Sequence, residues 1–279
     1  MHNACLNVGF FYAKGHGLQA GLAEGVMAQA RRWFGLPEEE KRRIALSPAS
    51  HYRGWQRLGS NHPAAAASPA AARPATGLGV PRHGRLQDAE FQRLLRAYIG
   101  GCLQLGAAIL RGIALGLQLP ESYFEGDVAG DSYWVTRIIH YPPLQPESSQ
   151  QAGSGQQAGS SQPPGGAGAG AGGAAGGGEE LSCGEHTDYG LLTLVFQQEG
   201  VTALQVKNAA GRWVDAPPLP GTCVVNIGDM FRLLTNGLYT PTAHRVLNSS
   251  GRDRISAPFF YETNFEAVIG PHPQFCRDR

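Results

Sequence analysis

Residues 184–197 read Gly-Glu-His-Thr-Asp-Tyr-Gly-Leu-Leu-Thr-Leu-Val-Phe-Gln, a polar motif followed directly by an apolar run. The run from Leu191 to Gln197 is short, apolar and preceded by Gly190, which predicts a β-strand. Within the motif, one residue separates His186 from Asp188. Alternate residues of an extended chain face the same side, so this imidazole and this carboxylate can converge on one metal ion.

Other short runs of the same kind predict a mainly β fold. They cover residues 133–141, 203–207, 222–227, 244–248 and 255–261, and Gly, Pro, Asn or Asp residues separate them. These strands do not alternate with helical segments, so a sheet built from strand–helix–strand units is not expected. Many short strands in succession favour a sandwich, a jelly roll or a barrel.

The first third of the chain has a helical pattern instead. Apolar residues recur at helical spacing over residues 18–34, and Gly35 follows as a stop signal. Pro37 then precedes an acidic turn that is typical of a second, short helix. A long amphipathic helix is expected over residues 86–117, and residues 61–80, rich in Ala, Pro and Gly, are expected to form a loop.

One low-complexity segment interrupts the strand-rich part of the chain. Residues 147–179 are mostly Gly, Ala and Ser, and such sequence buries too little apolar surface to offset the entropy of ordering it. The segment therefore predicts a disordered insertion in a loop between two strands. We expect an N-terminal helical region, residues 1–130, packed on a β domain, residues 131–279, that contains this insertion.

Charge and composition argue against several classes of protein. The 279 residues carry 23 Lys and Arg against 22 Asp and Glu, a net charge of +1, so neither nucleic acid nor an anionic membrane is an expected partner. No apolar run reads as long enough to cross a bilayer. The first ten residues lack the pattern of a secretory signal, and the five Cys include no C-x-x-C pair. We expect a cytoplasmic monomer with reduced thiols that acts on a small molecule.

A third metal ligand must come from elsewhere in the sequence, and His244, at the start of a later predicted strand, is the best candidate. Two imidazoles and one carboxylate on one side of an ion leave the opposite positions open. This arrangement is typical of non-haem iron(II), where a cosubstrate and O2 must both reach the metal. Zinc can bind the same ligands, although no candidate general base accompanies them. A buried His with an Asp partner is also common as a purely structural pair.

Arg254 and Ser256, which follow His244 along the chain, predict a carboxylate site. On a strand these two residues share a face, and their offset from His244 is even. A guanidinium binds a carboxylate through two parallel hydrogen bonds, and a nearby hydroxyl can add another.

Taken together with several further motifs, these residues resemble the 2-oxoglutarate- and iron(II)-dependent dioxygenases of the isopenicillin N synthase-like type. The resemblance covers nearly the whole chain outside the low-complexity segment. Besides those quoted above, the matching motifs are Gly9-Phe10-Phe11-Tyr12, His16-Gly17, Leu36-Pro37-Glu38-Glu39-Glu40-Lys41, Arg137-Ile138-Ile139-His140-Tyr141-Pro142, Asn226-Ile227-Gly228-Asp229 and His244-Arg245-Val246.

The resemblance implies a mainly β fold with flanking helices, built on a double-stranded β-helix (jelly-roll) core. It implies that His186, Asp188 and His244 bind iron(II) as the catalytic triad. It further implies that Arg254, Ser256 and Tyr141 bind the cosubstrate 2-oxoglutarate. Oxidative decarboxylation of 2-oxoglutarate to succinate and CO2 would be coupled, with O2, to hydroxylation of a small organic substrate, and ascorbate could support the iron. The candidate walls of the substrate pocket are Phe260, Tyr189 and Phe196, each with core packing as the alternative.

The sequence departs from the family pattern in two places. Plant members usually carry Asn where Ile139 stands and Tyr where His140 stands; a structural role is expected for His140. The chain also starts shortly before Gly9 and ends soon after Pro271, where the family usually continues, which is consistent with a shortened chain. Two rival functions remain at this point: an iron oxidase of the same fold that does not use 2-oxoglutarate, and a non-catalytic ligand-binding relative. The substrate itself cannot be read from the sequence.

Overall fold

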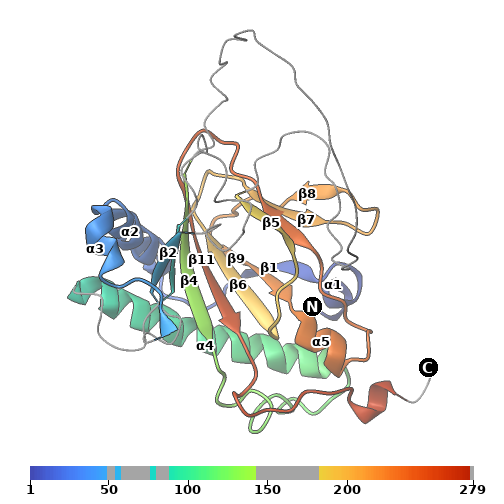
Figure 1. The fold of residues 1–279 in the computed structure, drawn as a ribbon. Helices are drawn as coiled ribbons and strands as arrows, with labels where there is room; N and C mark the ends of the chain where they lie inside the picture. Colours follow the sequence, from blue (N-terminus) through green and yellow to red (C-terminus); the bar gives the residue numbers. More distant parts are fainter. Residues whose placement is uncertain (49–53, 58–75, 80–87, 143–181, 277–279) are drawn as a thin grey trace, which may run out of the picture.

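The computed structural model describes residues 1–48, 54–57, 76–79, 88–142 and 182–276. The predicted insertion at residues 147–179 lies outside these described residues. In chain order, the elements are α1 (His2–Asn7), β1 (Phe10–Lys14), α2 (Leu22–Phe34), α3 (Glu38–Arg42), β2 (Trp55–Arg57), β3 (Thr76–Gly79), α4 (Ala89–Gly116), β4 (Val135–Tyr141), β5 (Cys183–His186), β6 (Leu192–Gln197), β7 (Leu204–Lys207), β8 (Trp213–Asp215), β9 (Thr222–Ile227), α5 (Asp229–Leu234), β10 (His244–Val246), β11 (Arg254–Tyr261) and η3 (Pro273–Phe275) (Figure 1).

The strands form two antiparallel sheets. The larger sheet has seven strands in the order β1-β9-β6-β11-β4-β3-β2, and the smaller sheet has four in the order β5-β10-β7-β8. From β4 onward the chain passes back and forth between the two sheets, which is the winding of a double-stranded β-helix. The predicted jelly-roll core with flanking helices is confirmed.

The two faces of the larger sheet carry different side chains. We call the face turned toward the helices the helix face and the face turned toward the smaller sheet the inner face. Along β6, the residues Leu192, Leu194 and Phe196 belong to the apolar core on the helix face, whereas Val195 packs on the inner face. The same alternation holds along β9 and β11, so one set of strands contributes to both a folding core and the interior of the jelly roll.

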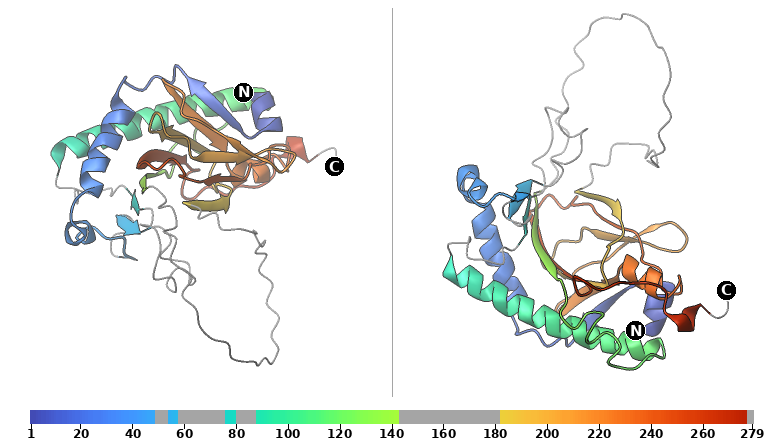
Figure 2. Two further views of the ribbon diagram at one scale, coloured as in Figure 1. Left: turned by 90° about the horizontal axis from the view of Figure 1, so that it is seen from above. Right: turned by 60° about the horizontal axis from the view of Figure 1, so that its bottom comes forward.

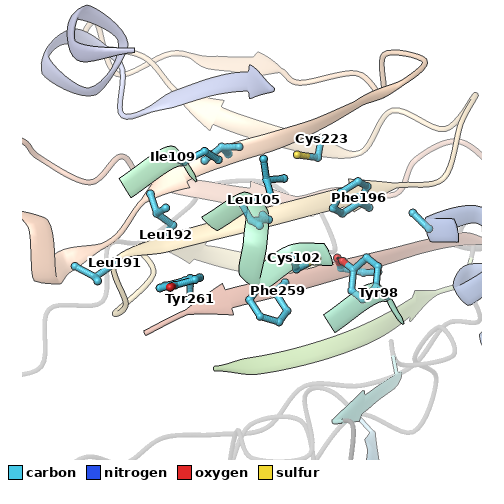
Figure 3. Close-up of a cluster of buried hydrophobic side chains, with 14 of the residues drawn as sticks. Tyr98, Cys102, Leu105, Ile109, Leu191, Leu192, Phe196, Cys223, Phe259 and Tyr261 are labelled. Carbon is cyan, nitrogen blue, oxygen red and sulfur yellow. The ribbon is translucent and has the colours of Figure 1, made fainter. Parts of the chain in front are cut away.

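The helix face is covered mainly by α4 and α2, which lie on one side of the sandwich (Figure 2). Helix α4 begins at Asp88, whose side chain accepts a hydrogen bond from the Phe91 backbone N–H at 2.9 Å. Figure 3 shows its apolar stripe against the strands. The packed side chains include Tyr98, Cys102, Leu105 and Ile109 from α4, with Cys223, Phe259 and Tyr261 from the sheet.

By length and hydropathy alone, α4 would qualify as a membrane span, which differs from the expectation that no such segment exists. One face of α4 is nevertheless buried against the sheet, and its buried residues recur at helical spacing from Phe91 to Ala114. This is the arrangement of a core helix, so its apolar character follows from the packing on the larger sheet.

Most predicted elements are found within a few residues of their expected ends. Helix α2 begins at Leu22 rather than at residue 18, because Gly21 has a left-handed backbone (φ +77°) at the N-cap. The loop expected over residues 61–80 is wrong for its last part, where β3 pairs with β4; residues 61–75 lie outside the described part. Residues 1–130, expected to form a helical region on the core, also contribute β1, β2 and β3 to the larger sheet.

Candidate functional site

The three predicted metal ligands lie together at one end of the smaller sheet. His186 ends β5 and His244 begins β10, and the two residues are direct partners across this antiparallel pair. Asp188 follows two residues after His186, and its Oδ1 lies 3.8 Å from His186 Nε2 and 3.7 Å from His244 Nε2. The three candidate ligand atoms all lie within 4.8 Å of one another, so a single divalent ion could contact all three.

The backbone fixes the tautomer of both imidazoles. His186 Nδ1 lies 2.8 Å from the Gly184 carbonyl oxygen, and His244 Nδ1 lies 3.3 Å from the Thr242 carbonyl oxygen. A carbonyl oxygen can only accept, so each Nδ1 carries a proton and each Nε2 is turned toward Asp188. Imidazoles held in this way through their second nitrogen are typical of metal ligands.

The pKa values of the two histidines are shifted in opposite directions. Burial lowers the pKa of His244, which favours the neutral form that binds metals. A hydrogen bond between His186 Nδ1 and the Cys183 sulfur, 3.9 Å away, raises the pKa of His186 to about 9. His244 is buried, whereas His186 is exposed.

Asp188 is oriented by two side chains from the inner face of the larger sheet. Its Oδ2 accepts hydrogen bonds from Thr193 Oγ1 at 2.5 Å and from Asn226 Nδ2 at 2.8 Å. Its Oδ1 is the oxygen nearer to both imidazoles. Because Asp188 is buried, this pair of hydrogen bonds holds the carboxylate in one rotamer with Oδ1 turned toward the imidazoles.

The loop that carries Asp188 is tied to the start of α5 through backbone contacts. Asp229 N–H donates to the Asp188 carbonyl oxygen at 2.7 Å, and Gly228 N–H donates to the Leu191 carbonyl oxygen at 2.9 Å. A Cβ at position 228 would collide with the carbonyl group of Gly190, so this close approach requires glycine. The Asn226–Asp229 motif thus supports the Asp188 loop.

Arg254 forms a second polar centre on the inner face, where it is almost completely buried. Its Nη2 donates to Gln197 Oε1 at 2.8 Å, and its guanidinium lies over the Tyr141 ring at 4.9 Å. Its Nε and Nη1 are buried and have no hydrogen-bond partner among the described residues. Two unpaired guanidinium donors fit the two oxygens of a carboxylate, which is the group that 2-oxoglutarate would present.

Tyr141 and Ser256 lie next to Arg254 on the same face. Tyr141 is the direct strand partner of Arg254, and burial raises its pKa to about 12, so its hydroxyl stays protonated and able to donate. Ser256 is buried two residues further along β11. The even offset of Arg254 and Ser256 from His244 does not place them on one face with it, because β10 and β11 belong to different sheets and the chain turns between them.

The three candidate pocket walls have different positions. Phe260 lies on the inner face and is the strand partner of Thr193, which binds Asp188. Tyr189 is 82% exposed and lies in the loop that carries Asp188, residues 187–191, which we call the metal-ligand loop. Phe196 was misassigned, because it packs on the helix face against Tyr98 and His16.

His140 also lies on the helix face, as expected for a structural histidine. It stacks on Phe34 and its Nε2 lies 3.0 Å from Asp253 Oδ1.

The sequence-based reasoning missed four residues that approach these two centres: Thr193, Gln197, Asn226 and Glu262. Thr193 and Gln197 are the polar positions of an otherwise apolar strand, a signal that could have marked the inner face of β6. Glu262 follows β11, and burial together with the charge of Asp188 raises its pKa to about 7.

Comparison with known families agrees with this geometry. Residues 136–263 match the 2OG-Fe(II) oxygenase superfamily, and residues 1–77 match the family described as non-haem dioxygenase in morphine synthesis N-terminal. The first of these matches spans β4 to β11 and therefore includes both polar centres. The second covers the N-terminal helices and strands that complete the larger sheet.

Similar proteins extend over almost the whole chain. It is 40% identical to homoarginine-6-hydroxylase 2-ODD-233 of Oryza sativa subsp. japonica, covering 100% of this chain and 81% of that protein. It is also 40% identical to homoarginine-6-hydroxylase 2-ODD-C23.1 of Arabidopsis thaliana, covering 97% and 78%. The fold is similar to that of a full-length Neurospora crassa protein solved in complex with alpha-KG and thymine, with a TM-score of 0.76, 23% identity and coverage of 98% and 83%. With its jelly-roll core and its two polar centres, the chain belongs to the 2OG-Fe(II) oxygenase superfamily.

Proposed function

We propose that His186, Asp188 and His244 bind the iron(II) of this oxygenase. The convergence of one carboxylate oxygen and two imidazole nitrogens supports this assignment. These ligand types suit a borderline divalent ion. Thr193 and Asn226 act as positioning residues, because both bind the Asp188 oxygen that points away from the imidazoles.

We also propose that Arg254 binds the distal carboxylate of 2-oxoglutarate. The observation that carries this proposal is the pair of buried Arg254 nitrogens without a partner among the described residues. Gln197 holds the third nitrogen, which sets the plane of the guanidinium. Ser256 and Tyr141 are hydroxyl donors for the same carboxylate, since both are buried on the inner face beside Arg254.

When bound, iron and 2-oxoglutarate supply the oxidising power, by coupling oxidative decarboxylation to succinate and CO2 with hydroxylation of the substrate by O2. The described residues contribute binding and orientation. Arg254 fixes the far end of the cosubstrate, and the backbone carbonyl oxygens of Gly184 and Thr242 hold each imidazole through Nδ1 so that Nε2 faces Asp188. Phe260, on the inner face beside Thr193, offers an apolar surface to the substrate.

For the substrate, we propose a free basic amino acid of the homoarginine type. The observation behind this proposal is that four relatives named as homoarginine-6-hydroxylases are 38–40% identical over 97–100% of this chain. The net charge of +1 supports a small-molecule substrate rather than nucleic acid or an anionic membrane. Gel filtration tests the expected monomer.

The direct test is turnover of homoarginine by the purified full chain with iron(II), ascorbate, 2-oxoglutarate and O2. We expect one succinate per turnover and, in mass spectrometry, the product heavier by one oxygen atom or its breakdown products, because a hydroxyl group on a carbon bonded to a guanidinium nitrogen can expel guanidine and leave an aldehyde. Asp188→Ala serves as the control for adventitious iron chemistry. Product formation that does not need 2-oxoglutarate would favour the rival iron oxidase, and the absence of any turnover with basic amino acids would reject the proposed substrate class.

A further inference from the structure

Glu262 directly follows β11, and its carboxylate lies next to the metal-ligand loop. It directly follows Tyr261, whose side chain points the other way, into the helix face, where its hydroxyl donates to the Ala129 carbonyl oxygen at 3.3 Å. Because successive residues of an extended chain alternate, Glu262 points to the same side as Phe260 and Ser256.

The carboxylate of Glu262 lies against Gly190, two residues after Asp188. A Cβ built on Gly190 would lie 2.6 Å from Glu262 Oε2, so the carboxylate occupies the space that a side chain at position 190 would fill. Glycine at this position therefore allows the carboxylate to approach the metal-ligand loop. The charge of Asp188 is near enough to act on Glu262.

Within the described part of the chain, the Glu262 carboxylate has no hydrogen-bond or ion-pair partner; only its backbone carbonyl oxygen is used, by Ser132 Oγ at 2.8 Å. The residue is nonetheless half-buried. A carboxylate that is partly removed from water without a counter-charge is unfavourable, and a cation bound beside it would offset that cost. Arg254, the buried cation on the same face, is held by Gln197 instead.

The chemistry of the proposed substrate places a cation, its guanidinium group, close to the metal ligands. In homoarginine, carbon 6 is bonded directly to a nitrogen of the guanidinium group. Hydroxylation at carbon 6 requires that this carbon lie beside the metal, so the guanidinium must also lie close to the metal ligands. The site should therefore contain an anion that is near the iron ligands but is not itself a ligand, and Glu262 has this position.

We propose that Glu262 is the specificity-determining residue that binds the guanidinium of the substrate and selects substrates with a cation next to the oxidised carbon. This inference rests on the proposed function. In this role the carboxylate of Glu262 accepts hydrogen bonds from the guanidinium N–H groups.

The test compares homoarginine with its neutral urea analogue, homocitrulline, in the full chain loaded with iron(II) and 2-oxoglutarate. Wild-type protein should prefer homoarginine in kcat/KM and, under anaerobic conditions, in affinity measured by titration calorimetry. Glu262→Gln keeps the size of the side chain and removes the charge, so it should reduce this preference by roughly 30-fold or more. Glu266→Gln, at an exposed glutamate of the same segment, is the matched control and should leave the preference unchanged.

Three results separate the possible explanations. If Glu262→Gln discriminates between the two ligands as well as wild type does, the inference is wrong while the proposed function stands. If wild type neither binds nor hydroxylates homoarginine, the proposed substrate class fails and this inference fails with it. If Glu262→Gln lowers the iron content, Glu262 is a metal ligand and the inference is overturned. Glu262→Asp keeps the charge and should retain the preference for homoarginine. It therefore separates loss of the charge from a folding defect caused by substitution at position 262.

Discussion

The two faces of the larger sheet are built by the same strands but have opposite chemistry. On the helix face, Leu192, Phe196 and Phe259 pack into one apolar core with α4 (Figure 3). On the inner face, the neighbouring positions Thr193 and Gln197 bind Asp188 and Arg254. A shift of one residue along β6 thus changes the role of a side chain from folding to support of the site.

The polar centres on the inner face therefore lie on a sheet whose stability comes largely from the apolar core on its helix face. The helix face contains most of the large buried side chains, including those of Tyr98, Phe91 and Phe259. The inner face instead contains buried polar groups, and two nitrogens of Arg254 have no partner among the described residues. Substitutions on the two faces should therefore have different consequences, and the following predictions test that difference in order of decreasing effect.

The largest effect is expected for Asp188→Ala on the inner face. It removes the one carboxylate of the proposed iron site, so 2-oxoglutarate turnover should fall to background while the fold is kept. Turnover measured by succinate release and the melting temperature measured by circular dichroism check both parts. Asp127→Ala, at an exposed carboxylate, should change neither. Full turnover in the Asp188 variant would remove this residue from the iron site.

Phe259→Ala tests the helix face. Loss of this fully buried ring should lower the free energy of unfolding by about 3–5 kcal/mol, because a cavity remains beneath α4. Below its melting transition the variant should keep its KM for 2-oxoglutarate. Leu115→Ala, on the exposed side of α4, should change stability by no more than about 0.5 kcal/mol. If Phe259→Ala lost cosubstrate binding but kept wild-type stability, the helix face would not have the separate, stabilising role assigned to it.

Arg254→Lys tests the cosubstrate site with the charge retained. The variant loses the planar pair of donors that fits a carboxylate, so KM for 2-oxoglutarate should rise by roughly 30- to 100-fold, with a smaller change in kcat. Steady-state kinetics of succinate formation give both values. Arg212→Lys, at an exposed arginine, is the control. An unchanged KM would mean that the carboxylate binds elsewhere.

Thr193→Val should have the smallest effect of the four. It preserves the shape of the side chain and removes one hydrogen bond to Asp188 Oδ2, so iron(II) affinity should fall by about 10-fold. Thr136→Val is the matched control, because this buried hydroxyl of the same sheet donates to Pro258 and does not touch Asp188. Equal losses of iron affinity in both variants would contradict a positioning role for Thr193.

Much of the fold could be predicted, because a long helical stripe and continuous apolar runs are strong signals of secondary structure. The helical stripe of α4 and the apolar runs of β6, β9 and β11 were identified close to their observed ends. The elements β1, β8 and α5 were not identified, although strands as short as β7 and β10 were. No continuous apolar run bounded by turn residues marks β8 or α5 in the sequence, and the run of β1 was used only as a family motif. Their formation depends on pairing with distant segments, as β1 does with β9.

In the two polar centres, too, local features could be predicted from the sequence and contacts between distant segments could not. His186 and Asp188 could be paired from spacing alone, because their geometry is local. Nearly all residues of β6 are buried, and the alternation of its polar positions, Thr193 and Gln197, was not used, so Phe196 was placed on the wrong face. The contact of Glu262 with Gly190 joins segments that are distant in sequence, so no local pattern reveals it.

The most direct test of the central claim is a structure of the full chain with iron(II) and 2-oxoglutarate determined without oxygen. We predict iron at about 2.0–2.2 Å from His186 Nε2, Asp188 Oδ1 and His244 Nε2. The distal carboxylate of 2-oxoglutarate should accept hydrogen bonds from Arg254 Nε and Nη1. Iron bound by other residues, or a cosubstrate carboxylate that leaves both Arg254 nitrogens without a partner, would contradict the assignment of the inner face as the active site.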